Sequence, residues 1–205
     1  MKVIGVTGGI CSGKTTFCEM LETAGAAVVN CDNLGHESYL PGQKCHDKLV
    51  ETFGAGILAA DGSGQIDRKK LSAIVFRSKE EIAKLNAIVW PAIYELALEK
   101  IEKIKAEKPD VKVVFVEAAL LLDASWAYDM CKDGIWVCHV PLDVAKERLM
   151  KRNNFSPEEA ERRIKAQRDP EEFKKIKGLQ LVRTDVTLEE MNKSAIAAYQ
   201  KVISE

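Results

Sequence analysis

Short apolar blocks alternate with longer amphipathic segments along the chain, which is the pattern of strands and helices in an α/β domain. The apolar blocks are rich in β-branched residues and occupy 2–6, 27–30, 111–116, 134–140 and 179–182. Blocks without polar alternation are typical of strands buried on both faces. The pattern therefore predicts a parallel sheet.

Helical periodicity fills the intervals between these blocks. Helices are predicted at 16–24, 43–53, 67–76, 79–108, 141–150 and 188–202, and a further helix is predicted to begin at 157 and to include 163 and 167. Pro91 lies inside the longest of them and predicts a kink or a break into two helices. We expect one three-layer α/β domain over 1–205, with helices on both faces of the sheet and helical inserts at about 43–110 and 153–178.

Composition and charge exclude several classes of protein. The chain has 205 residues, 46% of them hydrophobic and 30% charged, with a net charge of -1. Such a balance argues against binding nucleic acid or a membrane through bulk electrostatics, and no apolar run approaches the ~18 residues of a membrane span. No signal peptide is evident, so a cytoplasmic protein is expected, with a monomer as the default. Six scattered cysteines without a C-x-x-C pair favour buried fillers over zinc or disulfides.

The segment 8–15, GGICSGKT, fits G-x-x-x-x-G-K-[ST], a loop that cradles phosphates. It stands between a predicted strand and a predicted helix, which is the setting the motif requires. Lys14 would reach the β- and γ-phosphates of ATP, and the Thr15 hydroxyl would hold Mg²⁺. The predicted ATP contacts here are Gly8, Gly9, Ile10, Cys11, Ser12, Gly13, Lys14, Thr15 and Thr16.

Two carboxylates follow predicted strands, at the sheet edge where ligands bind in open parallel sheets. Asp32 comes after the strand at 27–30, beside the mouth of the loop. It could act there or cap the helix that follows. Glu117 ends the strand at 111–116 and could hold Mg²⁺ with Thr15, or cap a turn.

The segment 146–177 is rich in lysine and arginine. Ser156 followed by proline and glutamate marks a helix start, and Arg163 and Gln167 share one face of that helix. A basic helical flap could close over nucleotide phosphates. Charge pattern alone favours a solvated face with Glu158–Arg162 and Glu159–Arg163 pairs.

Taken together, these segments resemble the dephospho-CoA kinase family of the P-loop kinase superfamily. Residues 6–16 resemble its opening T-G-G-I-x-S-G-K-[ST]-[ST], 30–32 its D-A-D, 117–123 its D-x-P-L-L-x-E, and 163–167 its R-[IL]-x-x-Q. Segment 32–36 is similar to the eukaryotic form, and Trp90-Pro91 fills the family's W-P position. The resemblance covers nearly the whole chain.

This resemblance implies that ATP phosphorylates the ribose 3′-hydroxyl of dephospho-CoA, the last step of coenzyme A synthesis. Asp32 would be the general base, with Lys14 as its catalytic partner on the donor side. Arg152 and Arg163 would contact ATP phosphates, which replaces the solvated-face interpretation of the flap. The residues implied on the acceptor side are Asp32, Trp90, Pro91, Glu117 and Leu120.

The chain departs from the family pattern at several positions. Asn30 replaces the first acid of D-A-D, Ala119 replaces a proline, and Cys11 replaces a glycine in the loop. The segment 182–185 differs from the family's asparagine-containing stretch near adenine. We expect Cys11, near Lys14 and a helix N-terminus, to be either a reactive thiol or an inert filler.

Two other functions remain open on the sequence. Another small-molecule kinase, acting on a nucleoside or a sugar, would share the loop, the base and the lid. A nucleotide-binding switch is disfavoured because Asn192-Lys193-Ser194-Ala195 lacks the aspartate of an N-K-x-D guanine reader.

Overall fold

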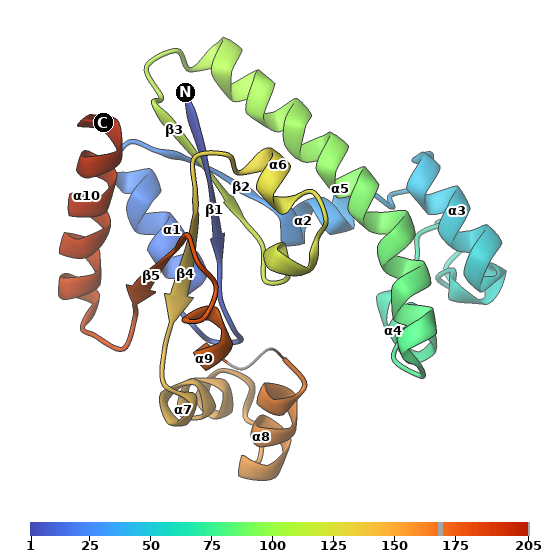
Figure 1. Cartoon of the computed structure of the whole chain (residues 1–205). Helices are drawn as coiled ribbons and strands as arrows, with labels where there is room; N and C mark the ends of the chain where they lie inside the picture. Colours follow the sequence, from blue (N-terminus) through green and yellow to red (C-terminus); the bar gives the residue numbers. More distant parts are fainter. Residues whose placement is uncertain (168–169, 205) are drawn as a thin grey trace. The chain divides into compact units, whose positions relative to one another are not determined.

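A computed structural model describes residues 1–167 and 170–204 (Figure 1). Its strands are β1 (Lys2–Thr7), β2 (Ala27–Asn30), β3 (Val113–Glu117), β4 (Ile135–His139) and β5 (Leu179–Arg183). They form one sheet in the order β2-β3-β1-β4-β5, and every pairing is parallel. The parallel sheet and each predicted strand are confirmed, within two residues at either end.

Alternate residues of β1 face opposite sides of the sheet. Ile4 and Val6 belong to a core with Phe17 of α1 (Lys14–Thr23), and α10 (Leu188–Ser204) packs beside α1 over this face (Figure 1). Gly5 faces the other side, where an added Cβ would lie 2.5 Å from Leu121 Cδ2. The short elements η2 (Leu121–Asp123) and α6 (Ala127–Met130), which the sequence did not predict, cover that side.

The chain divides into two compact units, one of residues 1–30 and 101–205 and one of residues 31–100. The second contains α2 (Cys31–Glu37), α3 (Lys44–Phe53), η1 (Ala55–Ile57), α4 (Arg68–Val75) and most of α5 (Lys79–Glu107). It has its own apolar core: Cys45, Leu49, Ile57, Ile66, Leu71, Val75 and Val89.

Three predicted helix features in this unit can be compared with the structure. The predicted helix at 67–76 is observed as α4, and Asp67 caps it by accepting from the amides of Lys69 and Lys70. Pro91 lies inside α5, so it does not separate two helices. Of the two roles considered for Asp32, the helix cap does not hold, because α2 begins at Cys31 and Asp32 lies in its first turn.

The basic segment forms α7 (Leu142–Asn153), α8 (Pro157–Lys165) and α9 (Pro170–Phe173) in the first unit. Ser156 caps α8 by accepting from the amide of Glu159, which confirms the predicted start. Arg163 pairs with Glu159 as expected, whereas Arg162 also pairs with Glu159 rather than with Glu158. Across the described residues, no helix is both long and apolar enough to cross a membrane.

Candidate functional site

The loop of residues 8–15 joins β1 to α1, as the motif requires. Gly8 has a φ of 149° and lies against β4, where an added Cβ would be 2.3 Å from the carbonyl oxygen of Cys138. Gly13 has a φ of 79° and begins α1 without a side-chain cap. The first amides of α1 are therefore available to an anion, and the helix dipole favours one there.

Cys11 has a φ of 55°, in the left-handed region that favours glycine. This explains physically why the family pattern has glycine at this position. Cys11 is half-buried, while the other five cysteines are buried and none of them forms a disulfide, which agrees with the filler interpretation for those five. The reactivity of Cys11 stays a prediction.

Two side chains that the sequence analysis did not select as site residues hold the loop through hydrogen bonds to its backbone carbonyls. The Thr184 hydroxyl donates to the carbonyl of Ser12 at 2.6 Å. Arg148 donates to the carbonyl of Thr184 at 2.6 Å and to that of Cys11 at 3.3 Å. Thr184 lies in the segment 182–185 that departs from the family pattern, and Arg148 lies in the basic segment 146–177, but neither was predicted to contact the loop.

Lys14 points its ammonium group across the loop. Its Nζ donates to the carbonyls of Gly8 and Gly9 at 3.0 and 3.2 Å. A cation held inside a ring of backbone amides is well placed to meet the oxygens of a polyphosphate.

Glu117, Thr15 and Asn30 form a polar cluster at the carboxyl edge of the sheet. Glu117 is 2% exposed, and Asn30 is its register partner on the neighbouring strand. One carboxylate oxygen accepts from Thr15 Oγ1 at 2.8 Å, and the other accepts from Asn30 Nδ2 at 2.7 Å. The structure thus brings together the two residues predicted to hold the metal.

This cluster fits Mg²⁺. A hydroxyl and a carboxylate are hard oxygen donors, and Mg²⁺ is usually held by one or two such groups together with water and substrate phosphates. Within residues 1–167 and 170–204, no group of three or more histidine, cysteine or acidic side chains forms a dedicated metal cage.

A cavity of about 330 Å³ adjoins the loop and the start of α1. It is lined by Arg148 and Arg152 of α7 and by Leu188 and Met191 of α10. A lining that combines two guanidinium groups with apolar side chains suits the stacking and burial of a flat nucleobase. Arg152, a predicted ATP contact, therefore lies at a cavity beside the loop, and its Nε donates to Asn153.

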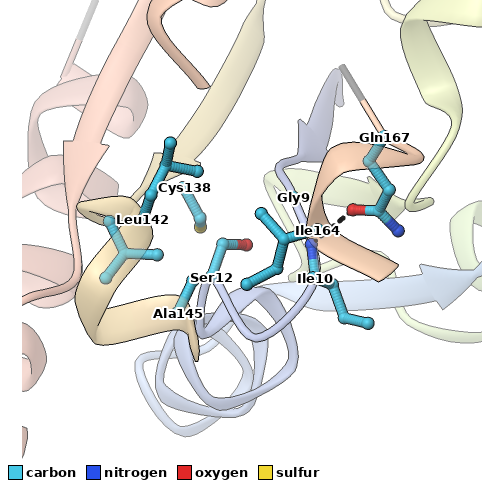
Figure 2. A pocket seen from close by; sticks show the side chains of 9 residues that line it. Gly9, Ile10, Ser12, Cys138, Leu142, Ala145, Ile164 and Gln167 are labelled. Carbon is cyan, nitrogen blue, oxygen red and sulfur yellow. Dashed lines mark hydrogen bonds between the residues drawn. The ribbon is translucent and has the colours of Figure 1, made fainter. Parts of the chain in front are cut away.

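A smaller cavity of about 20 Å³ lies between the loop, β4, α7 and α8 (Figure 2). Ser12 Oγ lines it, is buried, and has no hydrogen-bond partner among the described residues. The volume suffices for one water molecule, which would satisfy the hydroxyl. Cys138 lines the same cavity, and burial is the largest cause that raises the pKa of its thiol to about 12. The charge of Lys14 lowers this pKa and the charge of Glu117 raises it, and the thiol is uncharged at neutral pH.

Arg163, the other predicted phosphate contact, is bound to its own segment. Its Nε donates to Glu159 at 2.8 Å, and its guanidinium lies 4.5 Å from the centre of the Phe155 ring. The structure does not bring Arg163 to the loop. Gln167, from the same motif, does reach it: the Ile10 amide donates to Gln167 Oε1 at 2.7 Å.

Of the remaining predicted residues, Leu120 lines a small cavity together with Gly8 and Gly9 of the loop. Leu120 follows β3 and is 52% exposed. Asp32, Trp90 and Pro91 belong to the second unit, where Asp32 is exposed on α2. In that unit, burial first and the Arg68 charge second lower the pKa of His36, while the charge of Asp32 raises it.

The sheet order, the parallel strands and the phosphate loop before α1 define the class of P-loop small-molecule kinases. Shikimate kinase from Acinetobacter baumannii shares this fold, with a TM-score of 0.51 and 14% identity over 100% of this chain and 94% of its own. The dephospho-CoA kinase family model matches residues 2–190, and the chain belongs to that family.

Proteins named dephospho-CoA kinase are similar to this chain in sequence and in structure, which agrees with the family assignment. The dephospho-CoA kinase of Geobacter sulfurreducens is 39% identical over 94% of both chains. The dephospho-CoA kinase structure from Campylobacter jejuni has a TM-score of 0.60 and 25% identity, covering 98% of this chain and 97% of its own.

Proposed function

We propose that this chain phosphorylates the ribose 3′-hydroxyl of dephospho-CoA with ATP and so completes coenzyme A synthesis. The observation that carries the proposal is the family match over residues 2–190. Many kinases share the phosphate loop. A match over residues 2–190 also includes the helical insert and the strand ends to which we assign the binding of the phosphate acceptor.

The donor half of the mechanism follows from the loop. Backbone amides, the N-terminus of α1 and Lys14 would hold the β- and γ-phosphates, while the cavity beside Arg148 and Arg152 would take the nucleoside. Phosphoryl transfer needs little covalent chemistry from the protein, so alignment and charge neutralisation dominate. The hydrogen bonds from Thr184 and Arg148 to the loop carbonyls hold the loop in position to bind the phosphates.

Thr15 and Glu117 would hold Mg²⁺. When bound, the ion neutralises charge on the β- and γ-phosphates. Asn30 fixes the orientation of the Glu117 carboxylate, because the Asn30 amide donates to the oxygen that Thr15 does not use.

On the acceptor side, Asp32 would orient the ribose hydroxyl and accept its proton. We assign dephospho-CoA binding to the helical insert at about 43–110, which contains Trp90 and Pro91, with Glu117 and Leu120 contributing from the strand end. The segment at about 153–178 would be the lid that excludes water as a competing acceptor.

We expect Asp32→Asn to keep ATP affinity and to lower kcat by at least ~10²-fold, the scale of losing a general base. Steady-state kinetics with a direct ATP-binding titration would check this. Near-normal turnover would assign Asp32 a structural role in α2 alone.

The acceptor is tested by a panel of dephospho-CoA, nucleosides and sugars, each supplied with ATP and Mg²⁺. Turnover of dephospho-CoA well above the others supports the proposal. Turnover of a nucleoside or a sugar without turnover of dephospho-CoA would reject it in favour of another small-molecule kinase.

A further inference from the structure

One hydrogen bond joins α8 and its following turn to the phosphate loop. The Ile10 amide donates to Oε1 of Gln167 at 2.7 Å, between residues 157 positions apart in the chain (Figure 2). Gln167 lies just beyond the end of α8 at Lys165. The bond therefore connects the proposed lid directly to the proposed donor site.

The segment that presents Gln167 is itself held in place. Ala160 of α8 is fully buried, and Lys146 of α7 donates to Glu161 of α8 at 3.0 Å. Ile164 lines the small cavity beneath the loop together with Leu142 of α7. Gln167 thus extends from a supported helix rather than from a free surface loop.

The group that makes this contact is uncharged. Arg163, one turn earlier on α8, is engaged with Glu159 and with the Phe155 ring. A carboxamide carries an acceptor at one end and two N–H donors at the other. Figure 2 shows Oε1 of Gln167 toward Ile10 and Nε2 on the opposite side.

We propose that Gln167 is a positioning residue that docks the lid on the phosphate loop through the Ile10 amide. The bond joins two uncharged groups of the protein, so docking does not depend on the charge of the ATP phosphates. Once ATP is bound, the same contact keeps water away from the transferring group. This inference rests on the proposed function for its kinetic consequence, although not for the docking itself.

The test uses Gln167→Ala, Gln167→Glu and the matched control Gln180→Ala on the exposed face of edge strand β5. Amide hydrogen exchange at Ile10 is measured by NMR in the free full-length protein. Gln167→Ala should accelerate this exchange about fivefold to tenfold, the scale of one hydrogen bond. Gln167→Glu retains an acceptor and should stay protected, as should Gln180→Ala.

Kinetics supply the second readout. With ATP and dephospho-CoA, Gln167→Ala should lower kcat roughly tenfold and raise the fraction of ATP that is hydrolysed rather than transferred. Gln167→Glu should instead raise the KM for ATP, because its carboxylate faces the phosphates.

Unchanged Ile10 exchange in Gln167→Ala would overturn the docking role. A wild-type ratio of hydrolysis to transfer in that variant would overturn the water-excluding role. If the wild-type protein does not phosphorylate dephospho-CoA, the proposed function fails, while Ile10 exchange still decides the role of Gln167.

Discussion

Replacing Asn30 with alanine removes one of the two hydrogen bonds that hold the Glu117 carboxylate. The bond is 2.7 Å long, and Glu117 is only 2% exposed, so solvent has little access to the orphaned oxygen. A hydrogen bond to a charged group contributes roughly 1.5–3 kcal/mol. We therefore expect Asn30→Ala to lower the free energy of unfolding by about 2 kcal/mol.

A double-mutant cycle isolates this interaction from the other effects of each substitution. Urea unfolding at neutral pH, without nucleotide or metal, gives the unfolding free energies of the wild type, Asn30→Ala, Glu117→Ala and the double variant. The coupling energy should exceed about 1 kcal/mol, since the two groups bond directly. A coupling below about 0.5 kcal/mol would refute the claim that Asn30 holds the carboxylate.

Two further predictions concern stability. Cys11→Gly should raise the unfolding free energy by roughly 0.5–1 kcal/mol over Cys11→Ala in urea unfolding, since relief of the left-handed φ outweighs the added chain entropy; equal stability would contradict this. His46 bonds Asp47, the largest cause of its raised pKa, and the Gly64 carbonyl. Because the pKa of His46 is raised in the folded state, these hydrogen bonds stabilise the fold fully at pH values below the unfolded pKa of ~6.5. This contribution to the free energy of unfolding is lost as the pH rises through the folded pKa of His46. The excess Tm of the wild type over His46→Gln should therefore shrink as the pH rises above ~6.5, and a constant difference would contradict the assignment.

The local features of the donor site were predictable from sequence. A glycine loop between an apolar strand and an amphipathic helix has one common structural solution, so residues 8–15 fold as expected. Glu117 and Thr15 meet because the carboxyl ends of parallel strands and the helix after β1 share one edge of the sheet.

The contacts that complete the site were not predictable, because they join distant parts of the chain. Thr184 reaches Ser12 across 172 positions, and Gln167 reaches Ile10 across 157. No local pattern encodes such pairings. The family motif pointed to the segment of Gln167 but drew attention to Arg163, whose guanidinium is bound to Glu159 instead.

Two features of the observed secondary structure that the sequence left open or did not predict also have physical causes. A proline removes one helical hydrogen bond at about 3 kcal/mol or more, and a helix as long as α5, with its packed residues, can absorb this cost. The short α6 and α9 are each four residues long, too short to show a helical period.

The central claim is that this chain forms coenzyme A by phosphorylating the 3′-hydroxyl of dephospho-CoA. The most direct measurement is the identity of the product formed from γ-labelled ATP and dephospho-CoA, located by phosphorus NMR and mass spectrometry. The account predicts label on the ribose 3′-oxygen, and no transfer to an analogue that lacks this hydroxyl. Label at another position, or release of labelled inorganic phosphate alone, would contradict it.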